Sequence, residues 1–318
     1  MTIILLLAGL GLIVLGADRL VDGASAIARK AGVSEFVIGL TVVGFGTSCP
    51  ELVVSLTGAL QGNADISVGN VIGSNIFNTL FILGITAALM PVSMTEGNLR
   101  RDIPSTLAVT VILLLFGMSK TLLGIGGADS LSRAEGIVFL FLFGVYLYSC
   151  FRFDSKGQAE PSEHSKMKLP LAIMSVAAGL AGLIFGGNLF VDSATDLARR
   201  LGVSDKFIAV TILAGGTSLP ELATCIVAAA KHRGQMALGN ILGSNVFNIL
   251  LILGCCSVIT PLSFGGISLV DAGILFASCV LPLLWAFTGR KCRIDRWEGA
   301  LMLLVSAAYY CSLSMTGR

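Results

Sequence analysis

The stretch that decides the fold is Gly46-Thr47-Ser48-Cys49-Pro50-Glu51-Leu52, because the chain contains it twice. From Gly46 to Gly216 is an offset of 170 residues, and there six of the seven residues recur in Gly216-Thr217-Ser218-Leu219-Pro220-Glu221-Leu222. The same offset relates GNVIGSNIFN at 69–78 to GNILGSNVFN at 239–248. The chain therefore contains an internal repeat, and any fold assigned to it must accommodate two copies of one unit.

Each copy of the motif carries one acidic residue in apolar surroundings. Glu51 is the only charged residue between Glu35 and Asp65, and Glu221 is the only one between Lys206 and Lys231. A carboxylate at the centre of a bilayer costs at least ~2.5 kcal/mol, so an acid in such a place indicates a functional site. Two acids at equivalent places strengthen this hypothesis.

The composition indicates an integral membrane protein. The chain has 318 residues, of which 55% are hydrophobic and 13% are charged, and its mean hydropathy is +0.89. A soluble domain carries about 25% charged residues. The net charge of +2 comes without a basic cluster, so nothing in the sequence indicates nucleic-acid binding or implies a protein partner.

Most of the eight cysteines lie inside apolar runs, and none of those forms a Cys-x-x-Cys pair. We interpret them as small packing residues and expect neither a disulfide framework nor a cysteine metal site. The first apolar run, 2–17, has no basic start and no small-residue cleavage site, so it predicts a first spanning helix and not a signal peptide.

Ten apolar stretches approach the ~20 residues that cross a bilayer. They cover roughly 2–22, 36–61, 67–90, 104–124, 132–151, 168–190, 207–230, 236–260, 268–287 and 297–315. The repeat also relates 16–34 to 186–204, so one unit contains five helices. Because five is odd, the second copy enters the membrane from the opposite side. We predict an all-α polytopic membrane protein with two inverted five-helix repeats, at 1–151 and 168–318, joined by a cytoplasmic linker at 152–167.

The distribution of basic residues predicts the orientation. An extracytoplasmic N-terminus places fifteen of the 21 Lys and Arg residues in the cytoplasm. We therefore predict a multi-pass protein of the cell membrane with both termini outside.

The two motifs, 44–78 and 214–248, have the composition of an ion site. Pro50 lacks an N–H group, so we expect the second helix to bend or break around Gly44 to Pro50. The broken backbone leaves carbonyl groups without partners, and the Thr47 and Ser48 hydroxyls add oxygen atoms near Glu51. Most Ser and Thr hydroxyls in membrane helices bond back to their own helix. We expect these hydroxyls, in contrast, to face the site.

The second copy repeats this arrangement with Ala214, Thr217, Ser218 and Glu221. The following helices add oxygens at i, i+4 spacing from Ser74 with Asn78 and from Ser244 with Asn248. Two carboxylates with hydroxyl, amide and carbonyl oxygens suit a hard cation, so Ca²⁺ and Na⁺ are favoured over Mg²⁺, zinc or copper.

Other residues of the motifs have structural interpretations. The Gly69–Gly73 and Gly239–Gly243 pairs are typical of close helix packing. Four asparagines of the motifs are assigned to structure: Asn70, Asn75, Asn240 and Asn245.

The paired Gly-Thr-Ser-x-Pro-Glu and Gly-Asn-x-x-Gly-Ser-Asn-x-x-Asn blocks resemble the alpha repeats of the cation/calcium antiporter family, in its sodium/calcium exchanger branch, along essentially the whole chain. The resemblance implies ten helices, an inverted repeat, and first and sixth helices that slide past the other eight. It also implies exchange of about three Na⁺ for one Ca²⁺ through four cation sites and no cofactor.

The resemblance also implies roles for single residues. Glu51 and Glu221 would bridge the central Ca²⁺, with backbone carbonyls from Thr47 and Thr217 and amides from Asn78 and Asn248. One flanking Na⁺ site would use Ser218, Ser74 and the Ala214 carbonyl, and its mate Ser48, Ser244 and the Gly44 carbonyl. Some relatives, including the potassium-dependent branch, have Asp where this chain has Asn248, so the chain departs from the K⁺-coupled pattern.

These residues predict a secondary antiporter, in which a site of charge about −2 crosses the membrane only when loaded with cations. Proton/Ca²⁺ antiport is an alternative, because two neighbouring carboxyl groups in a low dielectric bind protons readily; a K⁺-dependent variant is another. An intramembrane hydrolase using Ser48 or Ser218 lacks a base near the motif. A channel fits poorly with inverted symmetry and broken helices.

Overall fold

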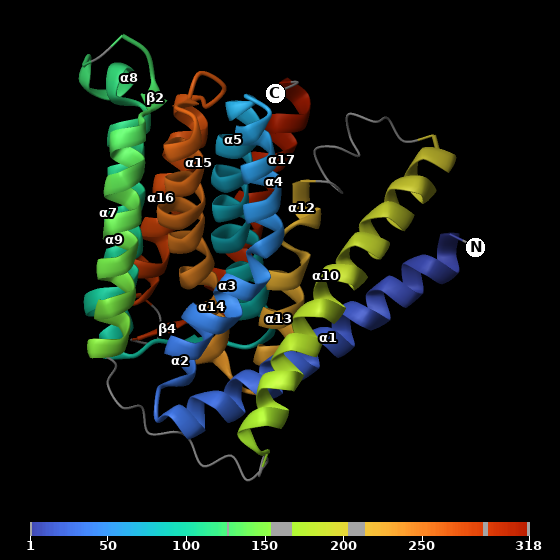
Figure 1. Cartoon of the computed structure of the whole chain (residues 1–318). Helices are drawn as coiled ribbons and strands as arrows, with labels where there is room; N and C mark the ends of the chain where they lie inside the picture. The colour runs from blue at the N-terminus through green and yellow to red at the C-terminus, as the bar shows by residue number, and fades with distance from the viewer. Residues whose placement is uncertain (1, 126, 154–166, 203–213, 289–291, 317–318) are drawn as a thin grey trace.

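The computed structural model describes residues 2–125, 127–153, 167–202, 214–288 and 292–316, and these residues form a helical bundle with two short strand pairs (Figure 1). The first half contains the helical segments α1 (Thr2–Ala31), α2 (Glu35–Ile38), η1 (Gly39–Val43), α3 (Gly44–Thr47), α4 (Cys49–Leu60), α5 (Ala64–Ile76), η2 (Phe77–Ile82), α6 (Leu83–Leu89), η3 (Asn98–Asp102), α7 (Ile103–Gly117), α8 (Ser119–Leu123) and α9 (Arg133–Arg152). The second half contains α10 (Leu169–Arg200), α12 (Ala214–Gly216), α13 (Leu219–Ala230), α14 (Gly234–Val246), η5 (Phe247–Leu253), α15 (Gly254–Ile259), α16 (Leu269–Trp285) and α17 (Arg296–Thr316).

Helix lies in each of the ten stretches in which the sequence predicts a span. In the described part of the chain, five continuous helices are long and apolar enough to cross a membrane, and the bent pair Glu35–Thr47 with Cys49–Leu60 makes a sixth. The count of ten therefore stays a prediction. Most of the expected linker and the start of the seventh stretch lie outside the described residues.

Two helices continue well past their apolar stretches. The sequence predicts a first span at 2–22 and a sixth at 168–190, whereas α1 extends to Ala31 and α10 to Arg200. Hydropathy measures the apolar length of a helix, while the helix itself ends where its backbone hydrogen bonds end. The last turns of α1 and α10 are therefore helical but polar, so they lengthen each helix and leave its apolar span unchanged.

The second helix breaks where the sequence predicts it. α3 ends at Thr47, α4 begins at Cys49, and the two segments of this span are bent by 47°. Because Pro50 in the first turn of α4 has no N–H to donate, the carbonyl four residues earlier loses its usual partner. The second copy has the same design, with Ser218 preceding α13 and Pro220 in its first turn.

Wide helical turns mark equivalent places in the two copies. η2 and η5 are π-helical and begin at Phe77 and Phe247, which the 170-residue offset relates. Such segments occur often at functional sites. Asn78 and Asn248 are the second residues of these two segments.

Helices α1 and α10 form a slanted antiparallel pair along one side of the bundle (Figure 1). A Cβ at Gly9 would lie 2.9 Å from the Gly186 carbonyl oxygen, and one at Gly16 would lie 2.8 Å from the Gly179 carbonyl oxygen. Contacts this close require glycine, because they bring the two backbones together as in other small-residue helix pairs. Because α1 is the first helix of one repeat and α10 is the first helix of the other, the two repeats begin with helices that run in opposite directions.

The glycines of α14 have the packing role that the sequence predicts. A Cβ at Gly239 would lie 2.2 Å from the Phe36 carbonyl oxygen, and one at Gly243 would lie 2.3 Å from that of Leu40. The segment of the second copy that corresponds to 36–43 is 206–213, which lies outside the described residues. The expectation for Gly69 and Gly73 therefore stays a prediction.

Two antiparallel strand pairs join loops of the two halves. β1 (Val92–Ser93) pairs with β4 (Arg293–Ile294), and β2 (Ser130–Leu131) pairs with β3 (Leu262–Ser263). The labels β2 and β4 lie at opposite ends of the bundle in Figure 1. Each end is thus closed by one strand from each half.

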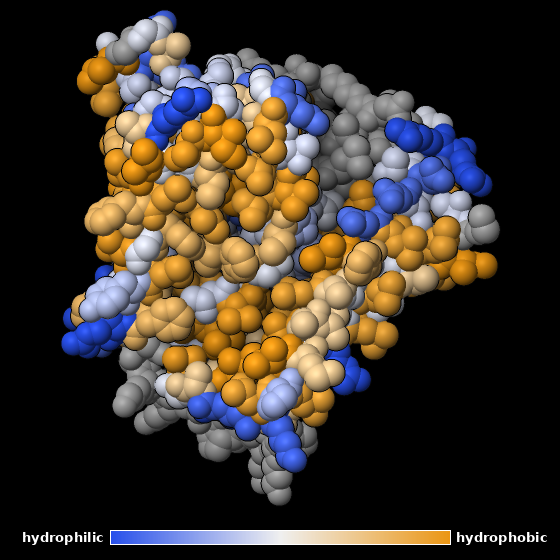
Figure 2. All heavy atoms as spheres, viewed as in Figure 1, coloured by the Kyte–Doolittle hydropathy of each residue, from blue (hydrophilic) through white to orange (hydrophobic). Residues whose placement is uncertain are grey.

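The outer surface is suited to lipid. Figure 2 shows a broad band of apolar side chains around the middle of the visible face, with hydrophilic residues above and below. Exposed large side chains of this kind include Phe141, Tyr148, Phe185 and Leu304. This pattern is that of a membrane protein, whose outward side chains contact hydrocarbon.

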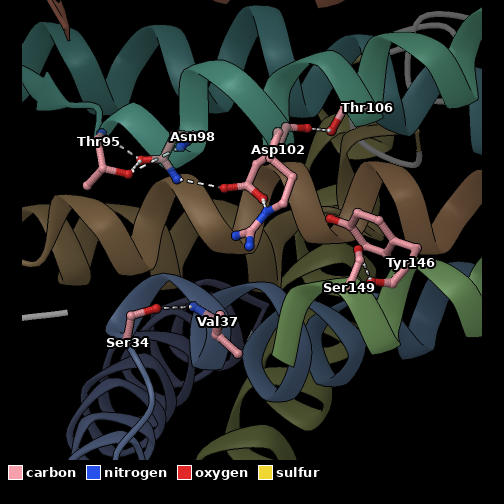
Figure 3. Close-up of polar contacts among 9 residues, drawn as sticks. Ser34, Val37, Thr95, Asn98, Asp102, Thr106, Tyr146 and Ser149 are labelled. Carbon is pink, nitrogen blue, oxygen red and sulfur yellow. Dashed lines mark hydrogen bonds and ion pairs between the residues drawn. The ribbon is translucent and has the colours of Figure 1, made fainter. Parts of the chain in front are cut away.

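Polar contacts fix the ends of several helices. Lys231 Nζ lies 2.7 Å from Asp18 Oδ1 and 2.8 Å from Asp22 Oδ1, and so joins the α13–α14 turn to α1. In Figure 3, Asn98 lies between Thr95 and Asp102, and its amide donates to Asp102 Oδ2 at 3.0 Å. The Asn98–Asp102 bond pairs two polar groups that would otherwise be buried alone, whereas the Lys231 ion pairs are partly exposed.

The two neighbouring glycines of α10 provide a matched test of the α1–α10 contact. Gly186→Ala is expected to destabilise the protein by about 1–3 kcal/mol, because its Cβ would lie 2.8 Å from the Ile13 nitrogen. Gly187→Ala, whose Cβ meets no described atom within 4 Å, is expected to leave stability unchanged or to raise it by up to ~1 kcal/mol through helix propensity. Thermal unfolding of both variants in detergent measures the difference; equal melting temperatures would contradict the close contact.

Candidate cation site between the two motifs

Glu51 and Glu221 occupy equivalent and fully buried positions. Each lies in the first turn of the helix that follows a break, in α4 and α13 respectively. Both residues are 0% exposed. The sequence prediction that neither acid faces lipid is therefore confirmed.

Serine hydroxyls link each acid to the opposite copy of the motif. Ser48 Oγ donates to Glu221 Oε1 at 2.9 Å, and Ser218 Oγ donates to Glu51 Oε1 at 2.9 Å. The two bonds are equivalent under the repeat, and each joins residues far apart in the sequence. The two carboxyl groups thus lie in one shared site and not in two separate ones.

Each carboxyl group keeps one oxygen without a partner. Glu51 Oε2 and Glu221 Oε2 are buried and accept no hydrogen bond within the described part of the chain. None of the ion pairs found there includes either acid. A buried carboxylate without a basic partner is strongly destabilised, so these oxygens require a cation or a proton.

Two amide oxygens are left in the same condition. Asn78 and Asn248 are 0% exposed, and the Oδ1 atom of each is buried without a donor among the described residues. Their nitrogen atoms, in contrast, both have acceptors. The two carboxylate and the two amide oxygens are acceptors only, and oxygens of these kinds match the ligands of a hard cation.

A second group of oxygens, from two serines and one backbone carbonyl, lies near the Glu221 carboxylate. Ser244 Oγ lies 3.4 Å from the Gly44 carbonyl oxygen and 3.5 Å from Glu221 Oε1, and the Ser48 hydroxyl contacts the same carboxylate oxygen. The structure thus brings together the Ser48, Gly44 and Ser244 of the expected flanking site.

The corresponding group in the other copy is described in part. Ser218 contacts Glu51, and Ser74 is buried in α5 with 3% exposure. Ala214 is the first residue of α12, directly after residues that the structure does not describe.

The expectation that the Thr47 hydroxyl does not bond back to its own helix is wrong. The Thr47 hydroxyl bonds back to its own helix, with its Oγ1 3.1 Å from the Val43 carbonyl oxygen, and it also lies 3.2 Å from Asn240 Oδ1. A threonine in a helix reaches the i−4 carbonyl easily, and the bend at Ser48 begins one residue too late to prevent it. The Thr217 Oγ1, in contrast, is buried and has no hydrogen-bond partner within the described residues.

The asparagines assigned to structure divide into two kinds. Asn70 donates to Ser55 Oγ at 2.9 Å and Asn240 donates to Cys225 Sγ at 3.3 Å, both within one copy, and Asn240 Oδ1 also accepts from Thr47 Oγ1 of the other copy. Asn75 and Asn245 instead bond across the copies to the site asparagines. The spacing of Asn75 and Asn245 along their own helices does not indicate these contacts, because spacing along one helix does not reveal contacts with another.

The soft-ligand alternatives find no support in the structure. No group of three or more His, Cys, Asp or Glu residues in the described part of the chain could hold a metal ion. All eight cysteines are free, which confirms that they form no disulfide framework. The donors that converge are oxygens, and oxygens suit alkali and alkaline-earth ions.

Comparisons with known proteins agree with this chemistry. The family described as sodium/calcium exchanger protein matches residues 1–152 and 171–315. The putative antiporter CaxA of Alkalimonas amylolytica is 37% identical, with 96% of each chain covered, and the sodium/calcium exchanger MaX1 of Methanosarcina acetivorans is 32% identical, also with 96% of each chain covered.

A solved structure of the sodium-calcium exchanger NCX_Mj has the same fold. The TM-score is 0.83 at 32% sequence identity, and the match covers 100% of this chain and 99% of that chain. The apolar helices and these relatives identify a multi-pass membrane transporter. On the evidence of both sequence and fold, the chain belongs to the sodium/calcium exchanger family.

Proposed function

We propose that the protein is a secondary active antiporter that exchanges Na⁺ for Ca²⁺ across the cell membrane by alternating access. The observation that carries this proposal is the pair of buried glutamates, one from each copy of the repeat, each with one carboxylate oxygen that has no hydrogen-bond partner among the residues described. The family to which the chain belongs supports cation/Ca²⁺ exchange. No step of this function requires an enzyme activity or a cofactor.

The charge of the site explains why transport is an exchange. Two carboxylates give a charge of about −2, and moving this charge unpaired through a dry bilayer centre is prohibitively costly. One Ca²⁺ or two Na⁺ neutralise the site, and a third Na⁺ leaves it with a charge of about +1, which is smaller than that of the empty site. The carrier therefore changes sides when it is loaded and stays in place when it is empty. About three Na⁺ for each Ca²⁺ fits one central and two flanking sites.

In this proposal the residues of the two motifs divide between the two ions. Glu51, Glu221, Asn78 and Asn248 hold Ca²⁺ at the centre, together with the backbone carbonyls of Thr47 and Thr217. Ser48, Ser244 and the Gly44 carbonyl hold one flanking Na⁺, and Ser218, Ser74 and the Ala214 carbonyl hold the other. Uncharged oxygens beside a carboxylate favour Na⁺ over H⁺ as the counter-ion, because a proton needs only one oxygen atom.

Alternating access follows from two oppositely oriented halves, 1–151 and 168–318, each with five spans. The antiparallel α1–α10 pair and the equivalent breaks before Pro50 and Pro220 support this arrangement. The two repeats then present the same site to opposite sides of the membrane. Both termini lie outside the cytoplasm in this proposal.

Removing either carboxylate tests the site. Glu51→Gln and Glu221→Gln keep the shape of the side chain but leave about one negative charge, so Na⁺-driven Ca²⁺ uptake is expected to fall at least about a hundredfold in each variant. Radiolabelled Ca²⁺ uptake by purified protein in liposomes measures the effect. Glu35→Gln, which changes a carboxylate outside the site, serves as the control; undiminished uptake in either site variant would contradict the proposal.

The choice of gradient tests the counter-ion. An outward Na⁺ gradient is expected to drive Ca²⁺ into liposomes at constant pH, because Na⁺ leaving the flanking sites is the coupled movement. A pH gradient without Na⁺ is expected to drive none, and added K⁺ is expected to change neither result. Uptake driven by the pH gradient alone would assign the protein to proton/Ca²⁺ antiport instead.

The native cysteine in the α16–α17 loop reports the orientation. Cys292 is exposed and lies among the basic residues that the charge distribution assigns to the cytoplasm. A membrane-impermeant thiol reagent is expected to label it in inside-out vesicles and not in intact cells, with Cys292→Ser as the control. Labelling in intact cells would reverse the predicted topology.

A further inference from the structure

In the proposed function the amides of Asn78 and Asn248 coordinate Ca²⁺, and only one of the two possible rotations of each amide group allows this. An asparagine amide carries an acceptor oxygen and a donor NH₂ group on the same planar group, so a half-turn of the side chain exchanges the two. The oxygen coordinates a cation, whereas the NH₂ group repels it. Whatever fixes the rotation of these amides therefore decides whether the site binds.

In both residues the NH₂ group is held by the opposite copy of the motif. Asn78 Nδ2 donates to Asn245 Oδ1 at 3.3 Å, and Asn248 Nδ2 donates to Asn75 Oδ1 at 2.9 Å. All four asparagines are at most 1% exposed, so water does not compete for these bonds. The bonds leave the Oδ1 atoms of Asn78 and Asn248 as the free ends of the two amides.

The two supporting asparagines are themselves fixed, but by different partners. Asn75 Nδ2 donates to the backbone carbonyl of Asn245 at 3.1 Å, and this group can only accept. Asn245 Nδ2 donates to Thr79 Oγ1 at 2.8 Å. Both supports therefore present an oxygen to the site asparagine that they hold.

The sequence explains why Asn245 and Asn75 are held by different partners. The residue equivalent to Thr79 in the second copy is Ile249, which is buried and has no hydroxyl group. The orientation of Asn78 thus depends on one side-chain hydroxyl, while the orientation of Asn248 depends on main chain. The two halves of the cation site have unequal support.

We propose that Asn75, Asn245 and Thr79 are positioning residues, which hold the amide oxygens of Asn78 and Asn248 toward the transported cation through hydrogen bonds that cross between the two copies. The proposal rests on the proposed function, since it assigns roles around the same site. It adds that Thr79 controls one specific ligand, Asn78, and has no influence on Asn248.

Thr79 offers the mildest test, because valine has nearly the same shape and Ile249 occupies the equivalent position. Thr79→Val removes the acceptor of Asn245 Nδ2 and is expected to raise the half-saturating Ca²⁺ concentration about three- to tenfold, the range for loss of one hydrogen bond. Thr79→Ser retains the hydroxyl and is expected to restore wild-type affinity. The maximal exchange rate at saturating Ca²⁺ is expected to change little in either variant.

Two backgrounds show whether Thr79 acts through the ligand that we assign to it. In Asn78→Ala the amide is gone, so adding Thr79→Val is expected to have no further effect on Ca²⁺ affinity. In Asn248→Ala the Asn78 amide remains, so adding Thr79→Val is expected to have its full three- to tenfold effect. A purely structural role for Thr79 would give the same additional effect in both backgrounds.

The measurement is equilibrium binding of radiolabelled Ca²⁺ to each purified variant, together with exchange in liposomes and the melting temperature without Ca²⁺. Wild-type affinity in Thr79→Val, equal loss in Thr79→Val and Thr79→Ser, or equal effects in the two backgrounds would each overturn the inference. If the wild-type protein neither binds Ca²⁺ nor exchanges it, the proposed function fails. If the wild-type protein does both and the variants give any of these overturning results, only the positioning role fails.

Discussion

The structure depends on the burial of two carboxyl groups that form no ion pair with any residue the structure describes. Glu51 and Glu221 each receive one serine hydroxyl from the opposite copy, and the second oxygen of each has no hydrogen-bond partner among those residues. A lysine or arginine at this place would stabilise the protein and abolish the site, because it would neutralise the charge permanently. In the proposed function a mobile cation neutralises this charge, so the loaded and the empty site differ in stability, and an exchanger uses that difference.

The backbone around Glu51 and Glu221 brings oxygen atoms close to the two acids. Proline in the first turn of α4 and of α13 ends one helix and starts the next at the depth of the site, and the carbonyl four residues before each proline loses its usual helical partner. Glycines at 239 and 243 let the segment 36–43 approach α14 closely, so that Ser244 reaches the Gly44 carbonyl. Irregular backbone in a membrane is acceptable here because protein, and not lipid, surrounds it.

Much of the candidate site was predictable from sequence, because its strongest signals are local. Isolated acids in apolar runs, prolines one residue before them and i, i+4 oxygen pairs each depend on a few neighbouring residues. The prediction was wrong for the Thr47 hydroxyl, which bonds back to Val43, and it did not assign Asn75, Asn245 and Thr79 to the site. The glycines at 9, 16, 179 and 186 were also not recognised as a helix contact, although their spacing of seven was visible.

The sequence by itself determined the membrane environment, the repeat and the identity of the acids, because hydropathy and the 170-residue offset are properties of the chain. It also placed the break in the second helix, since proline acts on its own backbone. Only the tertiary structure decided which oxygens meet. The serine-to-glutamate and asparagine-to-asparagine bonds join residues of different copies, and the orientation of a buried amide is set by partners that only packing brings within reach.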